Sequence, residues 1–235
     1  MHSNDDPAWA FIKSLGLKPG VDSFEKYSAL TREGIDEAKS FLKRQEFGLG
    51  PYPGEIILYV HKLIFHDVHD WAGQPRKTEL IIDRETRIPG SPPEHIISDL
   101  KTINDSAKGW FRSNDLQQLA KEMAAYHIAL HLVHPVLDGT GRTIRTILDV
   151  QRDLLMEREA ILNRESVKLD FFAIRDGYLD SCKKGVEKND PLPLAKLILE
   201  SCRLLEKANA QQQELETERE NRKILQQERL HSKSR

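Results

Sequence analysis

The chain has 235 residues, of which 31% are charged and 39% hydrophobic, which is the composition of a soluble globular protein with enough length for one core. A net charge of -2 argues against broad nucleic-acid binding, which needs a basic surface. The two cysteines, Cys182 and Cys202, are too few for a disulfide framework and favour a reducing compartment. We find no apolar run long enough for a membrane span and no hydrophobic signal core. We therefore expect a cytoplasmic protein, with later delivery into another cell left open.

The first part of the chain predicts helices joined by short loops. Residues 1–49 predict a helical extension with a short amphipathic piece, a helix capped by Asp22-Ser23, and a second helix from about Asp36 to Lys43. A loop rich in proline and glycine follows at residues 48–54. From Glu55 onward, apolar residues recur at helical spacing, which predicts a further helix.

Residues 77–89 are almost the only strand candidate in the chain. Leu80, Ile81 and Ile82 form a β-rich run, a polar turn follows, and Arg87-Ile88 make a short return. The pattern predicts a small hairpin inside an otherwise helical protein.

Beyond the hairpin the pattern is helical again. Helices are predicted after Pro93, after Asp115, through residues 142–150, around residues 171–179, and after Asp190. Residues 206–235 are rich in Gln, Glu, Lys and Arg and sustain no heptad repeat. That composition is typical of a solvated helix or a fraying tail, and an interaction helix is the alternative.

The stretch from residue 127 to residue 145 gathers the side chains that could carry chemistry. Pro135 ends one helix, because the residue before a proline avoids helical geometry. Asp138 to Gly141 predict a tight loop, and helical spacing resumes at Arg142. Glycines let backbone N–H groups point inward, and the next helix offers its positive dipole end, so the stretch predicts an anion-binding site.

The side chains around this loop suit phosphate chemistry. His134 could accept a proton from an attacking hydroxyl, since an imidazole titrates near neutrality. Asp138 offers a hard oxygen of the kind that Mg²⁺ prefers. Arg142 and Arg145 are three residues apart, so both can face the loop and bind phosphate oxygens.

The sequence HPVLDGTGRTIR at residues 134–145 resembles the signature of the Fic family, His-x-Phe-x-Asp/Glu-Gly-Asn-Gly-Arg-x-x-Arg. It departs from that signature at Val136, where the family has a buried Phe, and at Thr140, where it has Asn. A second likeness is the run at residues 64–76, a helix that ends in a Trp-Ala-Gly-x-x-Arg turn and reads as scaffold, with Arg76 starting the next strand. A turn of the family's Asn/Asp-x-x-Pro-Leu kind follows at about residue 189, so the resemblance covers about residues 50–200.

The resemblance implies an all-α, Fic-type helical domain, assigned here to residues 50–205, with one small β-hairpin flap. It also implies a protein adenylyltransferase, a Mg²⁺-dependent enzyme that moves AMP from ATP to a Ser, Thr or Tyr hydroxyl of a target protein. The flap, at Leu80, Ile81 and Ile82, would hold a segment of the target by strand addition; a hairpin without function is the alternative.

Each role in that reaction is carried over from the family to matching positions. His134 would deprotonate the target hydroxyl, and Asp138 would hold Mg²⁺ against the phosphates. The amides of the Gly139–Gly141 segment, Thr140 included, would cradle the α-phosphate. Arg142 and Arg145 would steady the outer phosphates.

The two departures from the signature leave other functions open. The Thr140 side chain is a shorter donor than Asn, and Val136 would leave the loop with a smaller anchor. The site could then be slow, silent or changed in the group that it transfers, such as phosphate, UMP or phosphocholine. The alternative class is a Fic-fold binding protein that has lost turnover.

Regulation by an internal helix is not expected. Many Fic proteins carry a Ser/Thr-x-x-x-Glu-Gly/Asn motif whose Glu blocks the ATP site, and here only near misses occur, at Glu33-Gly34 and Glu220-Asn221. We therefore expect control by a separate antitoxin-like partner, or use as a toxin or effector in a host cell.

The remaining histidines allow a weaker alternative, a zinc site or metal-dependent hydrolase built on His127, His131 and His134. No Glu follows His127 in the metalloprotease pattern and Pro135 disturbs the geometry, so a histidine-containing core helix is the preferred interpretation of His127 and His131. The spacing of His61, His66 and His69 does not place them on one helical face, which argues against a metal there.

Overall fold

A computed structural model describes residues 7–45, 47–83, 87–163 and 175–200 of the chain. Its helices are α1 (Pro7–Ser14), α2 (Phe24–Arg44), α3 (Gly54–Phe65), α4 (Ile96–Ser106), α5 (Leu116–Val133), α6 (Thr140–Asn163) and α7 (Arg175–Lys188). Residues 192–200 are also helical, and a short 3₁₀ helix, η1 (Pro93–His95), precedes α4. Strands β1 (Ile81–Asp83) and β2 (Ile88–Pro89) pair antiparallel, with Ile81 opposite Pro89. The expected helical domain with one small hairpin is confirmed.

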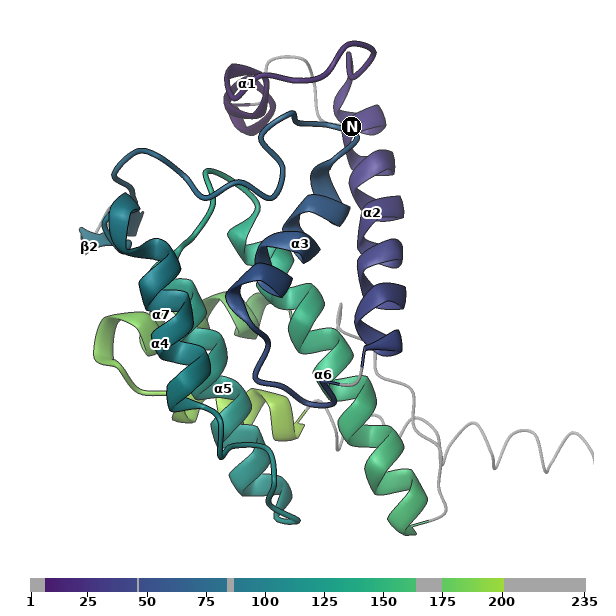
Figure 1. Cartoon of the computed structure of the whole chain (residues 1–235), viewed down its shortest axis with the longest axis vertical. Coiled ribbons are helices and arrows are strands. Elements are labelled where there is room, and N and C mark those ends of the chain that lie inside the picture. The colour runs from purple at the N-terminus through teal and green to yellow at the C-terminus, as the bar shows by residue number, and fades with distance from the viewer. Residues whose placement is uncertain (1–6, 46, 84–86, 164–174, 201–235) are drawn as a thin grey trace, which may run out of the picture.

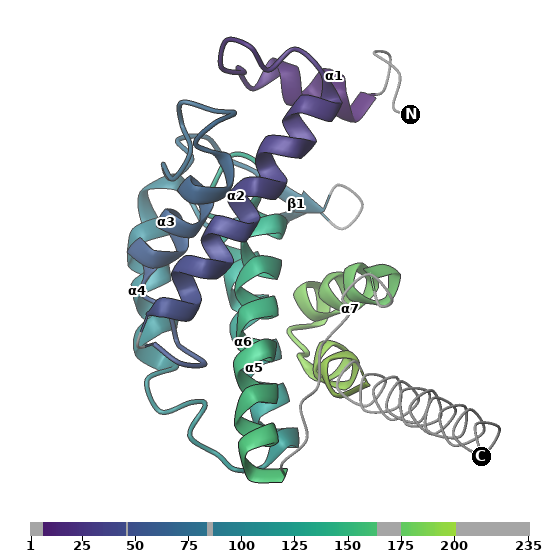
Figure 2. The same ribbon diagram turned by 90° about the vertical axis from the view of Figure 1, so that its right-hand side faces the viewer.

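Helices α5 and α6 lie at the centre of the domain (Figures 1 and 2). They pack against each other, with α3 and α4 on one side and α7 on the other. Helix α2 runs along α3 and α6, and the ion pairs Lys39–Asp149 (2.7 Å) and Lys43–Asp153 (2.6 Å) join it to α6. None of the described helices is long and apolar enough to cross a membrane.

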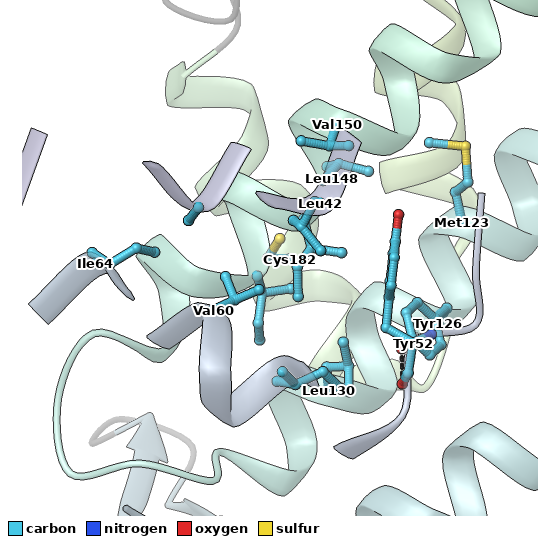
Figure 3. Packing of buried hydrophobic residues seen from close by; sticks show 14 of the residues in the cluster. Leu42, Tyr52, Val60, Ile64, Met123, Tyr126, Leu130, Leu148, Val150 and Cys182 are labelled. Carbon is cyan, nitrogen blue, oxygen red and sulfur yellow. Dashed lines mark hydrogen bonds between the residues drawn. The ribbon is translucent and has the colours of Figure 1, made fainter. Parts of the chain in front are cut away.

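The core is formed by apolar faces of these helices (Figure 3). Tyr126 of α5 also fixes the loop before α3, because its hydroxyl accepts from the Tyr52 amide and donates to the Tyr52 carbonyl, both at 2.9 Å. Both tyrosines are almost fully buried, so these bonds satisfy polar groups that water cannot reach. The loop that leads into α3 is thereby anchored to the central helix.

The expectation of two helices between residues 22 and 43 is wrong, because α2 is one continuous helix. The Ser23 hydroxyl caps it by accepting from the Lys26 amide at 3.1 Å, as predicted. Gly34 lies in its middle, where a Cβ atom would stand only 2.5 Å from the Leu63 carbonyl oxygen. The glycine lowers helix propensity locally, but it lets α2 and α3 approach closely, and this packing outweighs the cost.

The boundary of α6 also differs from expectation. The predicted loop was Asp138 to Gly141, but Thr140 and Gly141 already belong to the first turn of α6. This moves the N-terminus of the helix, with its unpaired amides, into the middle of the signature. Residues 171–174 of one predicted helix and the predicted tail at residues 206–235 lie outside the described residues.

Candidate functional site

His134 lies at the junction between α5 and the signature loop. It is the C-cap of α5, with a left-handed backbone at φ 47°, and its amide donates to the Leu130 carbonyl at 3.2 Å. The left-handed region is costly for a non-glycine residue and persists where neighbouring contacts hold it. Pro135 follows directly, so the chain turns sharply out of the helix at the residue predicted to act as a base.

Arg76 supplies the contacts that hold this turn. Its side chain is 3% exposed and donates only to backbone carbonyl groups: Nε to His134 (2.8 Å), Nη1 to Thr78 (2.6 Å), and Nη2 to Ser91 and to Val133 (3.4 Å). Its amide donates to the Pro135 carbonyl at 2.9 Å. The prediction that Arg76 starts a strand is wrong, because its hydrogen bonds go to the end of α5 and not to a neighbouring strand.

His61 of α3 supports the loop from the other side. The Gly73 amide donates to its Nδ1 at 2.8 Å, so Nε2 carries the proton and donates to the Asp138 carbonyl at 2.9 Å. The ring is almost fully buried, and burial lowers its pKa to about 4, which keeps it neutral in this role. One imidazole thus connects the Trp-Ala-Gly turn to the signature loop.

The N-terminus of α6 lies within the loop that the sequence predicts to bind an anion. Gly139 has φ 83°, and a Cβ atom there would stand 2.5 Å from the Phe65 ring, so only glycine fits this turn. The Thr143 amide donates to the Gly139 carbonyl at 2.9 Å. The amides of Thr140, Gly141 and Arg142 therefore have no partner within the helix. A helix N-terminus with free amides favours a bound anion.

The charged side chains of the signature surround this terminus. Arg142 donates to Oδ2 of Asp138 at 2.7 Å, and its guanidinium lies 4.5 Å from the centre of the Phe65 ring. The Arg145 guanidinium lies close to Gly141, whose Cβ position would be 3.5 Å from Nη1. Asp138 has a single carboxylate beside the free amides, a donor set that suits a Mg²⁺ ion sharing its coordination with phosphate and water.

The two residues that depart from the signature are both buried. Val136 is 1% exposed and Thr140 is 2% exposed, and they line a mostly apolar cavity of about 10 Å³, room for about one water molecule. The Thr140 hydroxyl is buried without a hydrogen-bond partner in the described part of the chain. It therefore does not face the loop surface, and Thr140 can offer an anion only its backbone amide.

Burial also sets the protonation of His134. It lowers the pKa of the imidazole to about 4, with the positive charge of Arg76 acting in the same direction and the His131 carbonyl opposing. A histidine with this pKa is unprotonated at neutral pH. It can accept a proton there without first losing one.

The base of the hairpin lies beside His134. The Ser91 amide donates to the Val133 carbonyl at 3.2 Å, and the Gly90 amide donates to the Leu80 carbonyl at 2.9 Å. Ile81 at the outer part of the hairpin is 48% exposed. The structure therefore brings the hairpin and the signature loop together, although more than 40 residues separate them in the sequence.

His66 and His69 each have one ring nitrogen close to a backbone carbonyl. Nδ1 of His66 lies 3.0 Å from the Leu63 carbonyl, and Nδ1 of His69 lies 2.7 Å from the Gly16 carbonyl. Within the described part of the chain, the ligand atoms of these two histidines and His61 do not converge on one point.

These features define a class: a helical domain in which a histidine ends one helix, a glycine turn leads into the N-terminus of the next, and the base of a hairpin lies beside the histidine. Residues 51–151 match the model of the Fic/DOC family. The resemblance to the Fic family stated from the signature is thereby confirmed for this part of the chain.

The curated relative is the protein adenylyltransferase VbhT of Bartonella schoenbuchensis, 26% identical over 125 residues. The match covers 49% of this chain but only 25% of VbhT, so the chain spans a quarter of that relative.

Solved structures share the fold. One is the N-terminal Fic domain of a VirB-translocated effector from Bartonella quintana with bound ADP, which has a TM-score of 0.61 and 18% identity. That match covers 79% of this chain and 88% of the other. BepC of Bartonella tribocorum with bound AMPPNP has a TM-score of 0.58 and 16% identity over 79% and 90% of the two chains. Fic-1 of C. elegans has a TM-score of 0.59 and 23% identity over 87% and 57%.

Two residues in this site were not predicted from the sequence to take part in it. The sequence analysis considered His61 only as a possible metal ligand and argued against that role. It predicted Arg76 to be the first residue of a strand. Both make hydrogen bonds to carbonyl groups of residues distant in the chain, a role that no local pattern signals. For Arg76, its place at the end of the Trp-Ala-Gly-x-x-Arg run was the available clue.

Proposed function

We propose that this protein transfers AMP from ATP to a hydroxyl side chain of a target protein. The observation that carries the proposal is the position of His134, held neutral at the end of α5 beside the free amides of α6. The match of residues 51–151 to the Fic/DOC family and the likeness to an adenylyltransferase support it. The nucleotide-bound Fic structures with the same fold support ATP as the donor.

The reaction balances with one base and one leaving group. His134 takes the proton from a Ser, Thr or Tyr hydroxyl of the target. The hydroxyl oxygen forms a bond to the α-phosphorus of ATP, and the bond between that phosphorus and the bridging oxygen breaks. Pyrophosphate leaves with the electron pair. Such phosphoryl chemistry depends mainly on positioning and on stabilising the spreading charge.

The loop provides that positioning and stabilisation. The amides of the Gly139–Gly141 segment bind the α-phosphate oxygens, and Arg142 and Arg145 bind the outer phosphates. Asp138 would hold Mg²⁺, which supplies positive charge to the phosphates when bound. Arg142 donates to Asp138 at 2.7 Å, which places its guanidinium beside the carboxylate proposed to hold Mg²⁺.

The hairpin is proposed to dock the target. The backbone of β1, with Leu80, Ile81 and Ile82, can add a strand from a target segment, and its exposed Ile81 offers an apolar contact. Strand addition uses backbone hydrogen bonds, so it presents different hydroxyl side chains to His134 without a fixed sequence.

Control by a separate inhibitor remains part of the proposal. Glu33, the near miss to an inhibitory glutamate, is exposed on α2, while the adjacent Gly34 packs against α3. This placement supports a site without an intact internal blocker, controlled by an antitoxin-like partner. The likeness to VirB-translocated Bartonella effectors supports a role as an effector in a host cell.

A second candidate is a Fic-fold protein that binds nucleotide or a partner with weak turnover, or that transfers another phosphate-containing group. Burial of the Thr140 hydroxyl favours it, because the signature's Asn amide has no substitute on the phosphate side of the loop.

Mass spectrometry after incubation with ATP and Mg²⁺ separates these candidates. We expect the wild-type chain to gain one AMP on itself or on a supplied protein mixture. His134→Ala should abolish this gain and retain ATP affinity within about threefold, because the phosphates are bound by the loop. A gain of phosphate would favour the other-group alternative. No gain together with intact ATP binding would refute AMP transfer and favour the binding protein, and normal transfer by His134→Ala would refute the assignment of the base.

A further inference from the structure

A buried polar cluster lies between α5 and α7, beside Arg145 of the signature, whose guanidinium is 5.6 Å from the centre of the Tyr178 ring. His127 and His131 are one turn apart on α5, and Tyr178 and Cys182 are one turn apart on α7. The two helices approach closely at Gly185. A Cβ atom added there would stand only 2.3 Å from the Ile128 side chain of α5. The cluster therefore combines two helical i, i+4 pairs that face each other.

The donor atoms of this cluster converge. One nitrogen of His127, one nitrogen of His131 and the sulfur of Cys182 all lie within 4.8 Å of one another. Nε2 of His127 also forms a short hydrogen bond with the Tyr178 hydroxyl, and Nε2 of His131 lies 3.1 Å from the same oxygen. His127 and Tyr178 are each 1% exposed and Cys182 is 6% exposed, so solvent is almost excluded.

We propose that His127, His131 and Cys182 form a structural zinc site, with the Tyr178 oxygen in the fourth position. Two imidazoles and a thiolate are ligands that suit Zn²⁺, which is bound tetrahedrally in structural sites. Bond lengths of about 2.0 Å to nitrogen and about 2.3 Å to sulfur place neighbouring ligand atoms about 3.5 Å apart. Side-chain rotations that shift the ligand atoms by about 1 Å would bring the present cluster to that geometry.

Charged side chains of α6 act on the cluster in both directions. The positive charge of Arg145 acts on all four side chains and opposes a cation, whereas the negative charge of Asp149 acts on Tyr178 and favours one. The Cys182 thiol gives up its proton on binding, so the thiolate offsets one charge of the ion. The Cys182 thiol and the Tyr178 hydroxyl also form a hydrogen bond, so zinc binding would replace the hydrogen bonds of this cluster with metal bonds.

We expect zinc binding to hold α5 and α7 together. An ion held by both helices cross-links α7 to α5, and His131 is three residues from His134. The site would therefore fix the last turn of α5 without touching substrate. The proposal does not depend on the proposed function, since binding and unfolding can be measured without ATP.

The test uses the full chain without an affinity tag, stripped of metal and titrated with Co²⁺ or with Zn²⁺ against a chromophoric chelator. We expect one ion per chain, a tetrahedral Co²⁺ spectrum and a thiolate-to-cobalt charge-transfer band. Saturating Zn²⁺ should raise Tm by about 5 degrees.

Variants assign the ligands. Cys182→Ser and His131→Gln should weaken zinc binding at least about a hundredfold, since even indirect support of a ligand is worth 10- to about 100-fold. Two controls should bind as wild type: Cys202→Ser, which removes the other cysteine, and His66→Gln, which removes an exposed histidine.

Three results would overturn the site: less than one ion per chain, a cobalt spectrum without the thiolate band, or unchanged affinity in Cys182→Ser. If that variant does not fold, the wild-type cobalt spectrum decides alone, because Cys182 is the thiol that lies in the cluster.

Discussion

Replacing Arg76 tests whether one buried side chain holds the turn at His134. Its guanidinium donates to four backbone carbonyls, three of them in or beside the end of α5 and the base of the hairpin. In Arg76→Met the aliphatic part of the side chain is kept and every one of these donors is lost. The carbonyls then remain in a region where Arg76 itself was 3% exposed.

The magnitude follows from the hydrogen bonds. A buried acceptor left without a partner costs about 1–3 kcal/mol, and a bond from a charged donor is worth about 1.5–3 kcal/mol. The bond to Val133 is long at 3.4 Å, so three bonds carry most of the effect. Allowing for water reaching some carbonyls, we expect Arg76→Met to lower the free energy of unfolding by about 4 kcal/mol, a large part of a typical 5–15 kcal/mol.

Urea unfolding followed by circular dichroism measures this loss. Arg32→Met is the matched control, because Arg32 is an exposed arginine on α2, and it should change stability by less than about 0.5 kcal/mol. Arg76→Lys keeps the charge but loses the planar fork, so its cost should lie between the two. A loss below about 1 kcal/mol in Arg76→Met would refute the argument that these carbonyls depend on Arg76.

Two further predictions follow from the loop. Stability should fall as pH falls from about 6.5 to about 4, because the unfolded chain protonates His61 in this range while the folded chain, in which its pKa is about 4, does not. His61 alone can contribute about 3 kcal/mol, measured as urea midpoints at several pH values. Burial also lowers the pKa of His134 and of the two histidines of α5, so His61→Gln should reduce the pH dependence without removing it, and an unchanged slope would contradict the buried neutral ring. Gly139→Ala should cost about 2–4 kcal/mol by thermal or urea unfolding, since it meets both a positive φ and the Phe65 ring, and a neutral effect would show that the turn can relax.

The local elements were largely predictable from the sequence. Helical periodicity located α3 and α5, the Ser23 cap located the start of α2, and a β-rich run with a polar turn located the hairpin. Each of these signals depends on a few neighbouring residues, so the local sequence is sufficient to predict the element. The glycine turn before α6 was predictable for the same reason, since glycine positions are a local feature.

The errors came where packing overrides local preference. Two helices were expected between residues 22 and 43, yet α2 is one continuous helix that packs closely against α3 at Gly34. Thr140 was expected in the loop facing phosphate, yet it opens α6 with its hydroxyl buried. In both cases packing against a neighbouring helix determines the local structure. The position of that helix cannot be predicted from the adjacent residues.

The sequence by itself therefore determined the helices, the hairpin and the chemistry-bearing signature from His134 to Arg145. Only the tertiary structure decided that Arg76 and His61 bind the carbonyls of that signature. It also brought Cys182 to the pair of histidines on α5, about fifty residues away in the chain. The physical reason is that periodicity reports which face of a helix is buried, whereas the partner of a buried polar atom is fixed only when the helices pack.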